Sequence, residues 1–170
     1  MNAKSVYSQA YKMLEKLTPI PVDCGQLCGA ACCQDTINDG SEAGMYLYPG
    51  EKVMLKDYDG IRIEKSDFKY GERRAEIAIC PGRCDRRFRP LSCRIFPLIP
   101  YKKENSPLTV IIDPRAKSMC PLAKTFTMDD FDEKFADAVM YIFKVLIKEK
   151  NVRDFVIEQS YLLDEYKKFL

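Results

Sequence analysis

The eight cysteines are the residues of this 170-residue sequence whose type and spacing are best suited to chemistry. They are Cys24, Cys28, Cys32, Cys33, Cys80, Cys84, Cys93 and Cys120. Because the sequence contains no histidine, a site for a soft metal would be built almost wholly from sulfur. Such a donor set favours zinc in a Cys₄ site, with thiolate-bound iron or an iron–sulfur cluster as the alternative. Eight thiolates would complete two four-sulfur sites.

Disulfides are the competing interpretation of so many cysteines. The N-terminal residues alternate polar and apolar side chains and lack the continuous apolar stretch of a signal peptide. No apolar run approaches the roughly 18 residues that a membrane-spanning helix needs. We therefore expect a cytoplasmic protein without a membrane partner, in a reducing compartment where structural disulfides are rare. Metal ligation is the prediction, and disulfides or unligated thiols are the alternatives.

The two cysteine-rich segments have different local patterns. Cys24, Cys28 and Cys32 recur at every fourth position and would share one face of a helix, although the glycines between them disfavour a continuous helix. In the second segment, Pro81 and Gly82 suit the centre of a type II turn that would bring Cys80 and Cys84 together. Each segment therefore predicts a local pair or trio of sulfur ligands.

Arginine is dense around the second cysteine segment. The arginines are Arg83, Arg86, Arg87, Arg89 and Arg94. A tetrathiolate centre is strongly anionic, so guanidinium groups nearby would stabilise it by donating hydrogen bonds around the sulfurs. The alternative for any single arginine is a solvated basic loop, but for Arg89 and Arg94 we favour the supporting role at the metal or cofactor.

The order of these motifs resembles a known family. The cluster at residues 24–33 precedes Arg89-Pro-Leu-Ser-Cys-Arg-Ile-Phe-Pro97 and a later lone cysteine, Cys120. Together they resemble the bacterial cysteine-cluster proteins of the CxxCxxCC type, the zinc- or iron-chelating YkgJ family, over residues 23–125. The resemblance implies metal binding but no established reaction, and a similar cluster in the flagellin lysine methylases implies an iron–sulfur alternative. One difference is that three residues, not two, separate the first cysteines.

The elements that would position these cysteines predict an α+β fold. We expect a single domain, 1–170, in which residues 18–125 form a small irregular metal-bound core with a few short strands. Strands are predicted at 46–48, 61–63, 74–80 and 108–112, and a short helix near 51–56, from local alternation and turn signals. Apolar periodicity predicts an N-terminal helix over 2–17 and a C-terminal helical hairpin over 127–170. Thr127 and Asp130 are predicted to cap the first helix of that hairpin.

Three functional interpretations remain open at this stage. A metal-binding protein with a structural or metal-handling role is the first, and a redox or methyl-transfer enzyme that uses the cluster is the second. Whether the chain is an enzyme is not decided, since it has no histidine base and no phosphate-binding loop. Nucleic-acid binding through residues 83–94 is disfavoured because the net charge is only +2. The C-terminal helices could also bind a protein partner, although apolar helix faces usually pack in a core.

Overall fold

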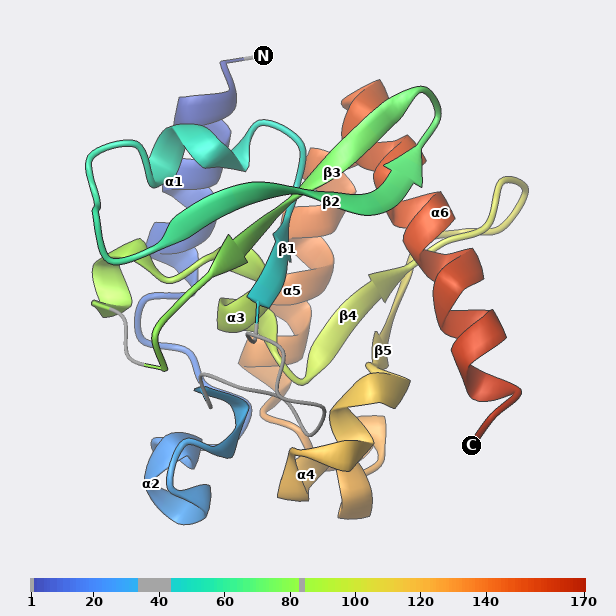
Figure 1. Ribbon diagram of the computed structural model, residues 1–170. Coiled ribbons are helices and arrows are strands. Elements are labelled where there is room, and N and C mark those ends of the chain that lie inside the picture. The colour runs from blue at the N-terminus through green and yellow to red at the C-terminus, as the bar shows by residue number, and fades with distance from the viewer. Residues whose placement is uncertain (1, 34–43, 83–84) are drawn as a thin grey trace.

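A three-stranded and a two-stranded antiparallel sheet pack with two long C-terminal helices in an α+β arrangement (Figure 1). The computed structural model describes residues 2–33, 44–82 and 85–170. The α-helices are α1 (Ala3–Met13), α2 (Cys24–Cys28), α3 (Leu91–Ile95), α4 (Pro121–Thr125), α5 (Glu133–Leu146) and α6 (Lys150–Lys167). The strands are β1 (Gly44–Leu47), β2 (Arg62–Tyr70), β3 (Arg73–Ile79), β4 (Leu98–Tyr101) and β5 (Thr109–Ile112). Short 3₁₀ helices are η1 (Ala31–Cys33), η2 (Glu51–Met54), η3 (Arg86–Phe88), η4 (Pro114–Ser118) and η5 (Met128–Asp130).

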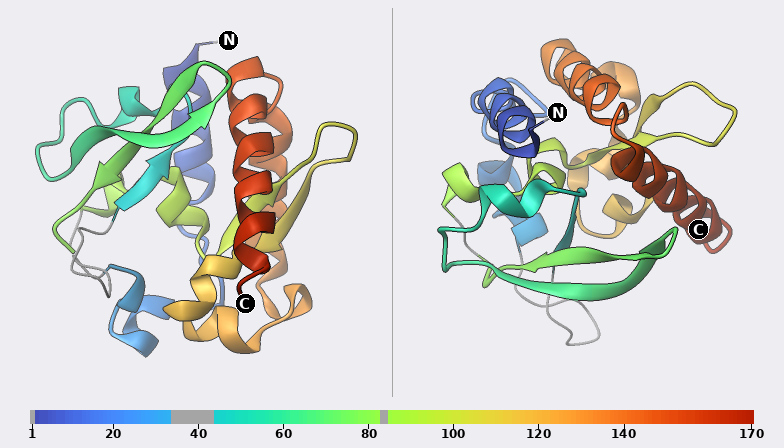
Figure 2. Two further views of the ribbon diagram at one scale, coloured as in Figure 1. Left: turned by 45° about the vertical axis from the view of Figure 1, so that its right-hand side comes forward. Right: turned by 90° about the horizontal axis from the view of Figure 1, so that it is seen from above.

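The larger sheet has the order β1-β3-β2, and both of its pairings are antiparallel. β2 and β3 form a hairpin in which Tyr70 pairs with Arg73, and Gly71 takes a positive φ of 57° that suits glycine in a tight turn. The smaller sheet joins β4 to β5, with Leu98 opposite Ile112. α6 contacts both β2 and β4, so this helix joins the two sheets (Figure 2).

The main core lies between α1, the sheets and the two C-terminal helices. Its centre is Phe155, which is fully buried and packs edge-on against aromatic rings from the larger sheet. Those rings belong to Tyr48, Phe68 and Tyr70, each with its centroid 5.3 Å from that of Phe155. Aromatic side chains bury large areas and prefer such tilted contacts. Most of the apolar energy of folding therefore comes from this region.

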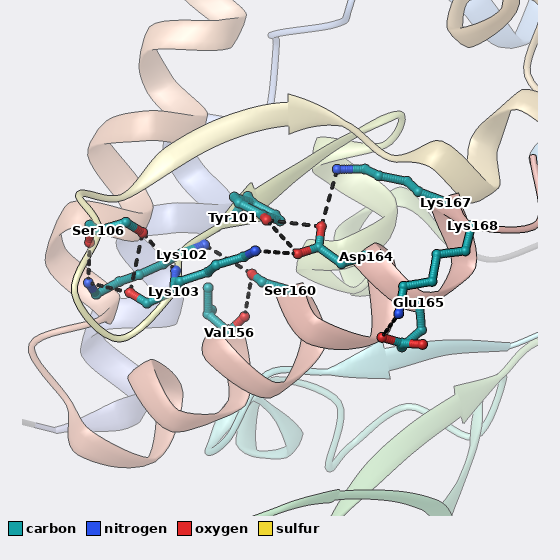
Figure 3. A network of polar contacts seen from close by, with 10 residues as sticks. All are labelled: Tyr101, Lys102, Lys103, Ser106, Val156, Ser160, Asp164, Glu165, Lys167 and Lys168. Atoms are coloured by element: carbon teal, nitrogen blue, oxygen red, sulfur yellow. Dashed lines mark hydrogen bonds and ion pairs between the residues drawn. The ribbon is translucent and has the colours of Figure 1, made fainter.

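Polar contacts also attach the β4–β5 hairpin to α6 (Figure 3). The Tyr101 hydroxyl donates to Asp164, and the ammonium group of Lys103 lies 2.6 Å from the same carboxylate. The backbone N–H of Lys102 donates to the hydroxyl of Ser160, which is fully buried in α6. The hairpin is thus held on α6 by several partly buried polar interactions.

Several predicted elements are present with different bounds. The N-terminal helix ends at Met13 rather than Leu17, and the chain does reverse between the two C-terminal helices. Thr127 and Asp130 do interact, since Asp130 accepts hydrogen bonds from the Thr127 N–H and hydroxyl. That pair belongs to the 3₁₀ helix η5, however, while Asp132 caps α5. The single helix expected from Thr127 was therefore wrong over its first turn.

Other elements were longer than expected or were not expected. β2 extends to Tyr70, well beyond the predicted residues 61–63, because its partner β3 continues across the hairpin. β4 was not predicted, since Pro100 lies inside it; this two-stranded sheet is all edge, where proline is tolerated. The short helix predicted near 51–56 is the 3₁₀ helix η2. Within the described residues, no helix has the length and apolar character that crossing a bilayer requires.

Candidate metal centre

Six of the seven cysteines that the structure describes line one cavity of about 900 Å³. They are Cys24, Cys28, Cys32, Cys33, Cys93 and Cys120. They come from α2, η1, α3 and the residue that precedes α4. In Figure 1, α2 and α4 lie at one end of the molecule and α3 lies nearer its middle. None of these six cysteines forms a disulfide with another described cysteine. Segments almost 100 residues apart in the sequence (Cys120 − Cys24 = 96) therefore present sulfur to a common space.

A tight turn directs the first cysteine segment into this cavity. The Asp23 carboxylate caps α2 by accepting from the Gly25 N–H at 3.1 Å. The helix ends after Cys28, where Gly29 and Ala30 take positive φ values of 61° and 56°. A left-handed alanine is strained because its Cβ approaches the following carbonyl group. Cys24, Cys28 and Cys32 therefore do not lie on one continuous helix, a point that the glycines between them had left open, and two short helices bring them to the same cavity.

Arg94 organises the loop on the opposite side of the cavity. Its guanidinium donates to the carbonyl oxygens of Arg86 and Arg89, each at 2.7 Å, and lies 4.1 Å above the ring of Tyr11. Arg86 in turn forms an ion pair with Asp23 at 3.4 Å, which connects this loop to α2. Arg94 therefore holds backbone carbonyl groups and also lines the cavity, while its predicted supporting role at a metal or cofactor stays a prediction.

The thiols of the cavity influence one another electrostatically. The hydrogen bond between Cys32 and Cys33, together with the charge of nearby Arg89, lowers the pKa of Cys33 to about 6 against the opposing effect of burial. The same hydrogen bond raises the pKa of Cys32. Burial raises the pKa of Cys24, and the thiols of Cys28 and Cys120 add to that rise. Thiolates are the form of cysteine that binds metal, and a bound cation would offset the electrostatic repulsion between them.

Cys120 is the most buried of the described cysteines. It is 8% exposed and lies in a small apolar cluster with Ala116 and Ala123, against Phe96. The following residue, Pro121, is the first of α4, a position at which a backbone N–H would have no intrahelical acceptor, so its absence from proline loses no hydrogen bond. The Cys-Pro step thus fixes the backbone directly after a thiol that lines the cavity.

Of the two remaining cysteines the structure describes only Cys80, which is not among the residues that line the cavity. Cys80 packs against a separate apolar cluster that contains Leu47 and Ala78, so the structure does not bring it to the other six. Gly82 has a positive φ of 79°, as the predicted turn requires, but its expected second ligand, Cys84, lies outside the described residues. Within those residues, no three cysteine or carboxylate side chains are placed closely enough to hold a metal ion.

The cavity nevertheless fits a soft metal in the chemistry of its donors. Every candidate ligand is sulfur, and Arg89 lies near enough to favour the charged form of Cys33. Four thiolates suffice for zinc or for an iron–sulfur cluster. The residues that could hold such a centre are the six cysteines of the cavity.

Sequence reasoning missed the residue that connects this site to the core. Glu51 is fully buried, and its carboxylate accepts hydrogen bonds from the hydroxyl of Tyr11 and the backbone N–H groups of Tyr48 and Leu91. Burial raises its pKa, and the three hydrogen bonds oppose the rise. A glutamate after a Pro-Gly pair resembles an ordinary exposed helix start, so the sequence contains no signal for this role.

Comparisons with known proteins add no family assignment. A scan of the chain against protein-family models finds no match. Comparisons with curated proteins and with solved structures find no match either. The functional argument therefore rests on the cavity itself.

Proposed function

We propose that this chain binds a thiophilic metal ion, with zinc as the preferred metal, through the cysteines that line the cavity. One observation carries the proposal: six thiols from four separate segments border one space. Chance burial of cysteine as a small apolar side chain would not require such convergence. The resemblance of the cysteine pattern to zinc- or iron-chelating proteins supports the same proposal.

Binding would require the thiols to approach one another. Four sulfurs around zinc must each lie about 2.3 Å from the metal, and the described thiols do not form even a set of three at such positions. We expect α2 and η1 to move toward Cys93 and Cys120, since residues 20–33 contain no buried side chain that would hold them in place. Each thiol would lose its proton as it binds.

A closed site of this kind would have a structural or metal-handling role. Zinc with four protein thiolates keeps no open position for a substrate, and its binding energy contributes directly to folding. Two of the six thiols would remain after four bind zinc, and these could take part in transferring the metal. The protein would then depend on metal for the order of one end rather than for catalysis.

An iron–sulfur cluster is the second candidate, and the size of the site favours it. A cavity of about 900 Å³ has room for a centre larger than a single ion, and four of its six thiols would suffice to hold it. Such a cluster would supply one-electron chemistry when bound, as expected for a redox or protein-methylating enzyme.

Metal analysis of anaerobically purified protein tests the proposal and separates the two candidates. We expect zinc, or iron with sulfide, in stoichiometric amounts in the wild-type protein. The variants Cys24→Ser and Cys93→Ser should lose most of it. Cys80→Ser is the matched control, because Cys80 packs outside the cavity, and it should retain the metal. Wild-type protein without metal, or full retention in both cavity variants, would contradict the proposal.

A further inference from the structure

Glu51 is a charged residue at a position where charge is rarely found. Its side chain is 0% exposed, and glutamate is almost never fully buried unless it is paired. Three donors surround the carboxylate: the Tyr11 hydroxyl at 2.7 Å, the Tyr48 N–H at 3.0 Å and the Leu91 N–H. Burying a carboxylate is costly, and these hydrogen bonds offset the cost only because all three are made at once.

The first of two connections from Glu51 to the cysteine cavity runs through α3. Leu91 is the first residue of this helix, and its N–H is one of those that a helix start leaves without an intrahelical partner. Pro90, at the cap position, has no side-chain group that could accept it. Glu51 supplies the missing acceptor from a distant segment, and Cys93 follows two residues later in the same short helix.

The second connection runs through the aromatic ring of Tyr11. Glu51 fixes the hydroxyl end of Tyr11, and the guanidinium of Arg94 lies over the ring at 4.1 Å. Arg94 also donates to the carbonyl oxygens of the loop that ends at Arg89. Arg89 lines the same cavity as the six cysteines. A displacement of Tyr11 would therefore reach the arginines around the thiols.

We infer that Glu51 is a positioning residue for the cysteine cavity, because it fixes the start of α3 and the Tyr11–Arg94 stack without lining the cavity itself. The effect of Glu51 on metal binding rests on the proposed metal site. Its role in positioning α3 and Tyr11 does not depend on that proposal. A carboxylate can accept from all three donors. A glutamine cannot, because its amide nitrogen would face either the Tyr48 N–H or the Leu91 N–H.

The test compares metal affinity in Glu51→Gln and wild-type protein, by competition with a chelator and by the absorption spectrum of the Co²⁺-loaded protein. Loss of a supporting hydrogen-bond partner near a metal site typically weakens binding by about 10- to 100-fold, and we expect a loss in that range with an altered spectrum. Ser160→Ala is the matched control. It removes a buried hydroxyl that donates to the Val156 carbonyl oxygen at 2.7 Å, far along α6, and should lower stability without changing metal affinity.

A second variant and a metal-free measurement keep the inference testable if Glu51→Gln folds poorly. Tyr11→Phe removes only the hydroxyl that donates to Glu51, and it should weaken metal binding less than Glu51→Gln does. In the metal-free protein, amide hydrogen exchange at residues 91–95 should accelerate in both variants and stay unchanged in Ser160→Ala. Unchanged affinity and exchange in both variants would overturn the inference alone. A wild-type protein that binds no metal would overturn the proposed function, and the exchange result would then decide the geometric part.

Discussion

The two ends of this molecule are built on different physical principles. The core end, formed by the sheets with α5 and α6, buries aromatic and aliphatic side chains such as Phe135, Phe143 and Phe155 at 0% exposure. The cysteine end, residues 18–33, 85–89 and 119–125, consists of short helices and turns, and no side chain of residues 20–33 is buried. A segment with so little buried apolar surface cannot offset the entropy of ordering its backbone.

The difference indicates where each end obtains its stability. The core end should fold through burial of apolar surface alone, because helices and strands there pack their apolar faces against one another. The cysteine end has polar connections instead, the Asp23–Arg86 ion pair and the carbonyl bonds of Arg94. Exposed ion pairs contribute little to stability. The proposed thiolate-bound metal would add binding energy at the end that obtains little from burial.

The largest expected effect comes from the centre of the core end. Phe155→Ala would remove a fully buried ring that contacts three aromatic side chains of the larger sheet. Such truncations cost about 3 to 5 kcal/mol in the free energy of unfolding, and urea denaturation would measure it. If the metal-binding affinity of the folded variant stays at the wild-type value, the two ends are independent. A matched loss of affinity would show that they are coupled.

Removing the proposed metal should affect the cysteine end and the adjoining helix α3. We expect that a chelator accelerates amide hydrogen exchange in residues 24–33 and 91–95 and leaves residues 135–163 protected, because only the former carry or adjoin the proposed ligands. Hydrogen exchange followed by mass spectrometry would measure both regions in one experiment. Equal acceleration over the whole chain would show instead that the metal supports the global fold.

The sequence predicted the core end more completely than the cysteine end. Periodicity identified the buried faces of the C-terminal helices, including Phe135, Val139 and Ile142, because apolar spacing follows directly from helix geometry. It also predicted that cysteines from distant segments converge in one or two sites, and six of them do line a common cavity. It could not predict that Cys80 packs against a separate apolar cluster, since spacing along the chain does not give tertiary contacts. The buried position of Glu51 could not be predicted for a related reason: its hydrogen-bond donors include groups 40 residues away in the sequence.

A smaller effect should follow from the strained turn of the cysteine end. Ala30 has a φ of 56°, a conformation that glycine adopts without steric cost. Ala30→Gly should therefore raise the free energy of unfolding by about 0.5 to 1 kcal/mol, the strain relieved less the added entropy of the unfolded chain. The control is Ala123→Gly in α4, where no positive φ favours glycine and the same change should destabilise. Destabilisation in both variants would show that the turn is not strained.

The smallest effect concerns a polar contact of the core end, the carboxylate of Asp164. Its hydrogen bond to Lys103, and that from Tyr101, lower the pKa of Asp164. A carboxyl group whose pKa is lower in the folded state stabilises the protein above its unfolded pKa and loses that contribution as the pH falls through the folded value. Asp164→Asn should therefore lower Tm by about 2 °C or less at pH 7, since exposed pairs are weak. The difference from wild type should shrink as the pH falls below about 4. A difference that persists in acid would mean that the contact acts through its hydrogen bonds rather than its charge, and that polar interactions support the core end more than its packing suggests.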